Sequence, residues 1–210
     1  MRIISHRGYW KTGEEKNTAA AFERSFTLGF GTETDFRDRA GELVIAHDLP
    51  NPQSCPAECF FALLSRRDRS LPLAINIKAD GLQGLLKSAL SRHGIENYFL
   101  FDMSVPDAIF SIKQGLRVFT RHSDVEPVPA FYAQAAGVWM DAFFDESWLT
   151  PAAILAHLSA DKQVCLVSPE LHRRPHGAFW TALKASAVAR HDRLILCTDF
   201  PDEAAGFFTT

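Results

Sequence analysis

Two histidines near the start of the chain are spaced in a way that suits acid–base chemistry. His6 follows the apolar pair Ile3-Ile4, and His47 follows the apolar run from Leu43 to Ala46. An imidazole titrates near neutral pH, so one histidine can take a proton from a nucleophile while the other protonates a leaving alkoxide. The sequence therefore predicts His6 and His47 as a general acid and base.

Two carboxylates between these histidines suit a metal ion. Glu33 and Asp35 lie two residues apart in the alternating run Gly31 to Phe36, so both side chains project from one face of a strand. Like charges that close are costly unless a cation neutralises them. Oxygen ligands suit a hard ion such as Mg²⁺ or Ca²⁺. The alternative is a solvated strand end with Arg37 or Arg39 as partners.

Two basic residues could complete a phosphate site. Arg7 stands beside His6, and Lys78 ends an apolar run that starts at Leu71. Fixed positive charge from such side chains holds a phosphate through charge-assisted hydrogen bonds. Taken singly, each is better explained as a surface ion-pair partner. Together with the histidines and carboxylates they predict a metal-assisted phosphate site.

The elements that must position these residues alternate between short apolar strands and amphipathic helices. We expect strands at 2–6, 31–37, 71–78, 98–103, 116–120, 137–142, 163–168 and 193–197, with a short apolar run at 43–47. We expect helices at 17–28, 57–64, 82–92, 106–113, 130–134, 148–158, 177–189 and 201–207. This alternation implies parallel strands joined by helical crossovers.

Eight such units predict an α/β fold of the closed (β/α)8 TIM-barrel type, in a single domain spanning 1–210. The chain is close to the lower size limit of about 200 residues for that fold, so its loops must be short. An open doubly wound sheet is the alternative, but no Gly-rich phosphate loop follows the first strand.

Composition narrows the class of protein. The chain has 210 residues, is 47% hydrophobic and 22% charged, and carries a formal charge of −3, which is typical of a globular protein that binds neither nucleic acid nor an anionic membrane. No apolar run approaches the roughly 20 residues of a membrane span, and no signal peptide is visible. Four scattered cysteines indicate free thiols rather than disulfides. A cytoplasmic location is expected.

In barrels of this type the C-terminal ends of the strands carry the chemistry, because the loops there converge on one mouth. Every predicted strand ends in ionisable or amide side chains. These are His6 and Arg7, Glu33 and Asp35, His47, Asn76 and Lys78, Asp102, Arg121 or His122, Asp141, Glu170 and His172, and Asp199.

The combined pattern resembles the opening signature of the glycerophosphodiester phosphodiesterase family. It consists of His6-Arg7-Gly8, Asn17-Thr18 with Ala21-Phe22, Gly29, Glu33-x-Asp35 and His47-Asp48, and Thr198-Asp199-Phe200-Pro201 resembles the family's closing motif. The resemblance implies a (β/α)8 barrel with a divalent cation, usually Ca²⁺ or Mg²⁺, that cleaves a phosphodiester and releases an alcohol. By position it makes His6 and His47 the catalytic pair, Glu33 and Asp35 metal ligands, and Arg7 and Lys78 phosphate contacts.

Two positions depart from that family. Asn76 stands where the family has a third carboxylate ligand, and an amide oxygen can still coordinate the cation but brings no charge, so affinity should fall. Asp102, Asp141 or Glu170 from neighbouring strands could compensate. The family also inserts a small subdomain after His47-Asp48, whereas only about 23 residues separate Asp48 from Leu71 here. The substrate pocket is therefore expected to be more open or differently walled.

The expected function is a metal-dependent phosphodiesterase acting on a small glycerophosphodiester or a related sugar- or lipid-derived head group. The expected partner is this small-molecule substrate, with no nucleic acid and no membrane, and the sequence indicates no oligomeric state. The attacking hydroxyl is either water or a vicinal hydroxyl of the substrate. A second hypothesis, favoured by Asn76, is a catalytically silent barrel that binds a phosphorylated ligand or a partner protein. A third is an enzyme of the same kind that acts on a larger lipid.

Overall fold

Short apolar strands and helices alternate along residues 1–209, the part of the chain that the structure, a computed structural model, describes. The chain divides into two compact units. Residues Ser5–Val118 make up the N-terminal unit, and Met1–Ile4 together with Phe119–Thr210 make up the C-terminal unit. The single domain expected from the sequence stays a prediction.

Parallel strands form the centre of the N-terminal unit. These are β2 (Gly31–Arg39), β5 (Leu73–Ile77) and β6 (Tyr98–Phe101), in which β5 pairs with both β2 and β6. The end of β1 (Arg2–His6) also belongs to this unit. Beyond Phe36, β2 continues into an antiparallel hairpin with β3 (Glu42–Ile45), and β3 pairs with the short β4 (Cys55–Pro56). The Ala46 amide then donates to the Asp35 carbonyl at 3.0 Å, so the hairpin returns the chain to His47 beside the middle of β2.

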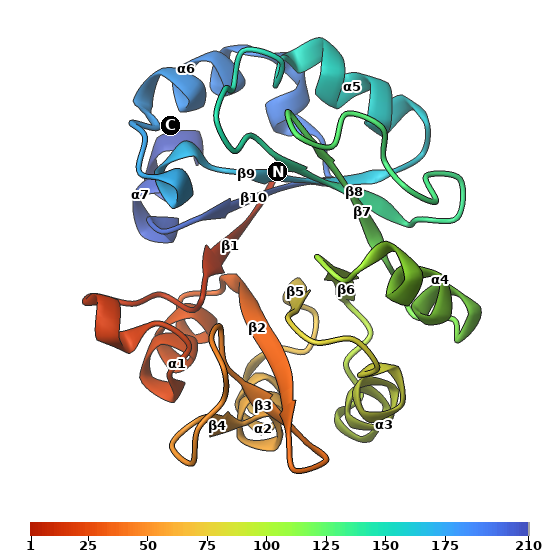
Figure 1. Ribbon diagram of the computed structural model, residues 1–210. Helices are drawn as coiled ribbons and strands as arrows, with labels where there is room; N and C mark the ends of the chain where they lie inside the picture. Colours follow the sequence, from red (N-terminus) through yellow and green to blue (C-terminus); the bar gives the residue numbers. More distant parts are fainter. Residues whose placement is uncertain (210) are drawn as a thin grey trace. The chain divides into compact units, whose positions relative to one another are not determined.

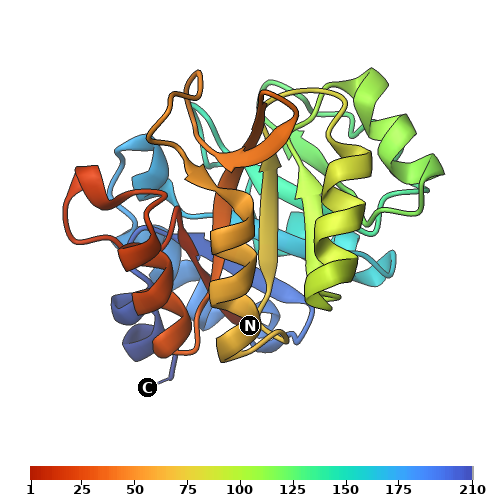
Figure 2. The same ribbon diagram turned by 90° about the horizontal axis from the view of Figure 1, so that it is seen from below.

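Four helices belong to the same unit. They are α1 (Ala19–Thr27), α2 (Ala57–Arg67), α3 (Gln83–His93) and α4 (Val105–Lys113), with a 3-10 turn η1 (Gly13–Glu15) before α1. In Figure 2, α1 (red), α2 (gold) and α3 (yellow-green) stand side by side over the strands. Phe60 of α2 is fully buried, with its ring centroid 4.7 Å from Phe22 of α1 and 5.9 Å from Phe36 of β2. This aromatic cluster fixes the two helices against the strand that carries Glu33 and Asp35.

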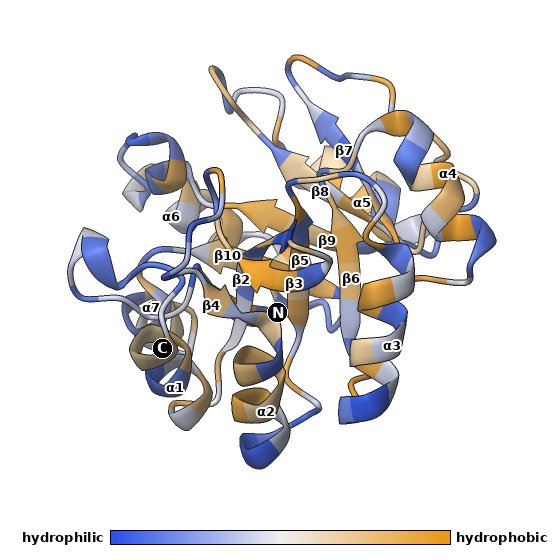
Figure 3. Ribbon diagram, turned by 60° about the horizontal axis from the view of Figure 1, so that its bottom comes forward, coloured by the Kyte–Doolittle hydropathy of each residue, from blue (hydrophilic) through white to orange (hydrophobic). Residues whose placement is uncertain are grey.

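Apolar composition explains why the central strands are buried. The run Tyr98-Phe99-Leu100-Phe101 gives β6 the orange of hydrophobic residues in Figure 3. All five residues of β5 are buried, which is typical of a parallel strand covered on both faces.

The C-terminal unit holds four parallel strands in the order β7-β8-β9-β10, drawn from green to blue in Figure 1. Their bounds are Phe119–Ser123, Gly137–Asp141, Gln163–Val167 and Leu194–Thr198. The helices of this unit are α5 (Pro151–Ser159), α6 (Gly177–Ala185) and α7 (Pro201–Thr209), with 3-10 turns η2 (Pro169–His172) and η3 (Ala187–Arg190). Trp180 of α6 is almost completely buried in the core of this unit.

The sequence placed most elements within a few residues of their observed bounds, but three differ. No helix forms near 130–134, because Phe131 has a positive φ of 52° and the segment folds as turns. The fifth predicted strand starts later, at Phe119, after an isolated bridge between Val118 and Leu100. The helix expected to reach residue 189 ends at Ala185, because Ser186 is extended.

Two further features concern the lengths of the helices and the state of the cysteines. Within residues 1–209, no helix combines the length and the apolar composition needed to cross a bilayer. Cys55, Cys59, Cys165 and Cys197 carry free thiols.

Candidate functional site

Strand β2 places Glu33 and Asp35 side by side in the interior of the N-terminal unit. Their exposed fractions are 1% and 0%. The register of β2 with β5 sets Asp35 directly beside Asn76. Because residues i and i+2 of a strand share a face, both carboxylates and the Asn76 amide belong to the same side of the sheet. The strand pattern read from the sequence is confirmed at this point.

The turn after β1 joins His6 and Arg7 to this strand. Arg7 and Gly8 have positive φ angles of 59° and 81°. The Arg7 amide donates to the Glu33 carbonyl at 2.9 Å and faces the Glu33 Oε2 atom at 3.3 Å. His6 Nε2 lies 3.9 Å from the same oxygen. A Cβ on Gly8 would approach the Ala21 Cβ to 2.7 Å, so only glycine allows this close turn.

Three nitrogen-bearing side chains surround Asp35. Arg7 Nε lies 2.9 Å from Oδ2, Asn17 Nδ2 donates to Oδ2 at 2.8 Å, and Lys78 Nζ lies 3.6 Å from Oδ1. Arg7 and Lys78 are each only about one-fifth exposed. The two cations predicted to hold phosphate are thus gathered at the candidate metal ligands.

Asn17 is the contact that sequence reasoning missed. Thr18, and not Asn17, is the N-cap of α1, and its side chain accepts from the Ala21 amide. Asn17 instead adopts a left-handed φ of 60° and bonds to Asp35 and Thr34. Asparagine tolerates this conformation better than most residues, and an Asn directly before a capping Thr is the signal that could have indicated it.

Asp102 joins the cluster through Lys78. It follows β6 with a positive φ of 72°, and its Oδ2 atom lies 3.2 Å from Lys78 Nζ. Burial lowers the pKa of Lys78, and the nearby charges of Asp35 and Glu33 oppose that shift. Asp102 is therefore an ion-pair partner of the lysine within this unit.

The two buried carboxylates have different electrostatic surroundings. Burial and then the charge of Asp35 raise the pKa of Glu33 to about 8, against an ordinary value of 4.5. The charges of Arg7 and Lys78 and a hydrogen bond from Asn76 only partly offset this rise. Asp35 is the better neutralised of the two because both cations form ion pairs with it. An additional positive charge near Glu33 would stabilise its ionised form.

The donor atoms fit a hard cation. Within residues 1–209, the buried atoms Asp35 Oδ1 and Asn76 Oδ1 accept no hydrogen bond. Buried acceptors without partners are rare and cost about 1–3 kcal/mol each. No three His, Cys, Asp or Glu side chains in that range form a metal cluster, so the set is two carboxylates and one amide. Such oxygen ligands suit Ca²⁺ or Mg²⁺, with less negative charge than three carboxylates would give.

His47 lines the same cavity as Arg7, and the carboxylate that its ring contacts is that of Asp48. Its ring is about half exposed, and Nδ1 lies 2.8 Å from the Asp48 carboxylate. Its carbonyl oxygen accepts from Arg37 Nε and Nη2 at 3.1 and 3.0 Å. His47, Arg7 and Asn17 line one cavity of about 620 Å³. The two predicted acid–base residues therefore stand at different parts of the site, His6 on Glu33 and His47 on the cavity wall.

Asp141 and Glu170 belong to the C-terminal unit and have partners there. The Asp141 Oδ1 atom lies 2.6 Å from His172 Nε2. Glu170 accepts from the hydroxyls of Ser168 and Thr198 and from the Asp199 amide. Their part in a cation site stays a prediction.

A second titratable cluster lies in the C-terminal unit. His157 of α5 bonds through Nε2 to His122 Nδ1 and through Nδ1 to the Tyr132 hydroxyl, both at 2.9 Å. Burial, and then the charge of His122, lower the pKa of His157 to about 4. This network ties the loop after β7 to α5.

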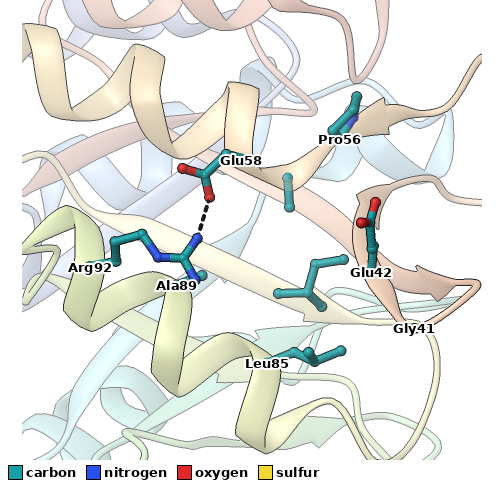
Figure 4. A pocket seen from close by; sticks show the side chains of 9 residues that line it. Gly41, Glu42, Pro56, Glu58, Leu85, Ala89 and Arg92 are labelled. Carbon is teal, nitrogen blue, oxygen red and sulfur yellow. Dashed lines mark hydrogen bonds and ion pairs between the residues drawn. The ribbon is translucent and has the colours of Figure 1, made fainter.

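A separate cavity of about 340 Å³ lies between the β3 hairpin, α2 and α3 (Figure 4). Leu43, Leu85 and Ala89 contribute apolar lining, and the ion pair of Glu58 with Arg92 crosses one side at 2.9 Å. None of the residues predicted for the phosphate site lines it.

Comparison with solved structures identifies the fold. A glycerophosphodiester phosphodiesterase from Parabacteroides distasonis is 15% identical, with 99% of this chain and 96% of that chain covered and a TM-score of 0.76. A phosphodiesterase from Oleispira antarctica, solved with the product sn-glycerol-3-phosphate, is 13% identical over 100% and 97% of the two chains, with a TM-score of 0.71. A Ca²⁺-dependent phosphatidylinositol-specific phospholipase C from Streptomyces antibioticus is 11% identical over 99% and 96%, with a TM-score of 0.59.

These likenesses show that the chain has the (β/α)8 barrel fold of the glycerophosphodiester phosphodiesterases, as the sequence predicted. No protein-family model matches the sequence, and no curated protein sequence is significantly similar to it.

Proposed function

We propose that the protein is a metal-dependent phosphoric diester hydrolase that cleaves a small glycerophosphodiester into an alcohol and a phosphomonoester. One observation carries the proposal: Glu33 and Asp35 are buried next to each other, with Arg7 and Lys78 as cations beside them and His6 in reach of Glu33. The full-length likeness to phosphodiesterases supports the same reaction class.

In this proposal each side chain has a defined task. Arg7 and Lys78 bind the phosphate oxygens, and their charges are already held in place by Asp35. His6 and His47 act as general acid and base, one removing a proton from the attacking hydroxyl and the other protonating the departing alkoxide. Asp48 orients the His47 ring through Nδ1, leaving Nε2 for the proton transfer.

Glu33, Asp35 and Asn76 would hold the divalent cation; Asn76 Oδ1 and Asp35 Oδ1 accept no hydrogen bond, and Asp35 Oδ1 has only the ion pair with Lys78. When bound, the cation supplies polarisation of the phosphoryl oxygens and a lower pKa for the attacking hydroxyl. The Ca²⁺ dependence of the Streptomyces antibioticus phospholipase C, which has the same fold, supports Ca²⁺ or Mg²⁺ in this role.

The direct test is hydrolysis of bis(p-nitrophenyl) phosphate and of a panel of glycerophosphodiesters, with Mg²⁺ or Ca²⁺ and with EDTA. We expect turnover that EDTA abolishes and that either ion restores. Turnover that survives EDTA would contradict the metal role, and no turnover of any diester with either ion would contradict the reaction class.

The acid–base roles are tested by His6→Ala and His47→Ala. Each should lower kcat by about 100-fold or more, because general acid–base catalysis contributes that much. His191→Ala is the matched control, since His191 lies in the C-terminal unit beside Asp192 and outside the site. Unchanged turnover in either site variant would remove that histidine from the mechanism.

Asn76 favours a second candidate function, a barrel that binds a phosphorylated ligand without cleaving it. Three carboxylates would hold a dication more strongly than the two carboxylates and one amide present. Calorimetric titration with Ca²⁺ and Mg²⁺ separates the two: the enzyme should bind one of them with measurable heat, and the silent barrel should bind neither well.

A further inference from the structure

The cavity beside His47 extends well beyond the residues assigned to phosphate and proton transfer. Its volume is about 620 Å³, and its walls come from two loops, 13–19 and 45–55. It begins at Arg7, Asn17 and His47 and continues to Asn51 and Gln53. A diester with its phosphate at Arg7 would therefore direct one of its two alcohol groups into this cavity.

The side-chain amides of Asn51 and Gln53 line the cavity from a turn that hydrogen bonds hold in place. Asn51 Oδ1 accepts from the Gln53 amide at 2.9 Å, Ser54 Oγ accepts from the Asn51 amide at 3.0 Å, and the Ser54 amide donates to the Asn51 carbonyl at 3.0 Å. Within residues 1–209, neither Asn51 Nδ2 nor the side-chain amide of Gln53 makes a hydrogen bond. A rigid turn thus presents donors and an acceptor that hydroxyl groups can use.

The charge of the cavity wall disfavours a cationic ligand. Lys16 lines the cavity, its Nζ lies 4.4 Å from the centroid of the Trp10 ring, and it forms no ion pair within residues 1–209. The one acidic side chain on the wall, Asp48, is bonded to His47. Among the described residues that line the cavity none is Phe, Tyr or Trp, so these walls lack the aromatic cage that suits a quaternary ammonium group.

We propose that this cavity binds the head-group alcohol of a glycerophosphodiester, the alcohol other than glycerol, and that it selects head groups with several hydroxyl groups over a quaternary ammonium head group. Asn51 and Gln53 bind the hydroxyls, and Lys16 excludes the cationic head groups. This inference rests on the proposed function, because it assumes that the phosphate is bound at Arg7 and cleaved.

The test compares kcat/KM on glycerophosphoinositol, glycerophosphocholine and bis(p-nitrophenyl) phosphate. The wild type should prefer glycerophosphoinositol to glycerophosphocholine. Replacing both amides (Asn51→Ala with Gln53→Ala) should lower kcat/KM on glycerophosphoinositol at least about tenfold more than on bis(p-nitrophenyl) phosphate, mainly through KM. Lys16→Glu should raise the ratio for glycerophosphocholine over glycerophosphoinositol several-fold.

Two matched controls lie outside the cavity. Gln134→Ala removes an exposed amide of the C-terminal unit, and Lys113→Glu reverses an exposed charge at the end of α4, so both should leave all ratios as in the wild type. If the wild type cleaves the diesters but the cavity variants leave the ratios unchanged, the subsite is wrong and the proposed function stands. If the wild type cleaves none of the three with Mg²⁺ or Ca²⁺, the proposed function fails first.

Discussion

Glu33→Gln should make the cation-free protein more stable, by an amount that grows as the pH rises from about 4.5 to about 8. The folded protein raises the pKa of Glu33 to about 8, whereas an unfolded chain would keep it near 4.5. Between these values the folded state binds more protons than the unfolded state, so stability is lost as pH rises. Glutamine carries no charge at any pH, and its amide oxygen can still face the Arg7 amide.

The size of the effect follows from the two pKa values. Ionising Glu33 in the folded state costs at most about 5 kcal/mol above pH 8, and at pH 5 about 1 kcal/mol or less. Relaxation of the site and entry of water reduce the upper figure. We therefore expect the gain in unfolding free energy of Glu33→Gln over the wild type to be about 2–4 kcal/mol larger at pH 8.5 than at pH 5.

Urea unfolding in EDTA at both pH values measures this difference. Glu96→Gln, at an exposed carboxylate between α3 and β6, is the control and should show no such dependence on pH. Adding Ca²⁺ or Mg²⁺ at pH 8.5 should reduce the stability difference between Glu33→Gln and the wild type, because an ion at 100 times its Kd stabilises the wild type by about 2.7 kcal/mol. An equal gain for Glu33→Gln at pH 5 and pH 8.5, or no gain at either, would refute the assignment of a buried, charge-deficient carboxylate.

Three further predictions concern stability. Because the pKa of His157 is lowered, its contribution to the free energy of unfolding is fully present above pH 6.5 and is lost as the pH falls toward 4. After allowing for solvent, this loss is on the order of 1–2 kcal/mol. Thermal unfolding should show that the wild type loses more stability between pH 7.5 and pH 4.5 than His157→Gln does, and equal losses in the two proteins would contradict this. Thr150→Ala should cost about 1 kcal/mol because Thr150 Oγ1 accepts from the Ala153 amide as the cap of α5, whereas Thr150→Ser should retain most of it in urea unfolding. Gly137→Ala should destabilise by about 1–3 kcal/mol, because the new Cβ would clash with the Phe119 ring and lie 2.6 Å from the Gln163 carbonyl oxygen, while Gly84→Ala in α3 meets no neighbour and should stabilise by about 0.5–1 kcal/mol. A more stable Gly137→Ala or a less stable Gly84→Ala in calorimetric melting would refute the packing argument.

Local periodicity was enough to predict most of the fold. The alternation in Gly31 to Phe36 put Glu33 and Asp35 on one face, because strand pleating depends on neighbouring residues alone. The segment 130–134 shows the limit of this reasoning. Its composition permits a helix, but the chain turns at Phe131, and the Thr120 hydroxyl donates to the Ala130 carbonyl from ten residues away.

The sequence by itself determined which residue types are available for chemistry: two histidines, two carboxylates, an arginine and a lysine at or beside strand ends. Only the tertiary structure decided which of them share an environment. Pairing of β2 with β5 set Asp35 beside Asn76, and the left-handed turn at Asn17 brought a further donor to Asp35. Those contacts join residues 18 to 41 positions apart, and their burial sets the pKa of Glu33, because desolvation depends on everything packed around a group and not on its neighbours in the chain.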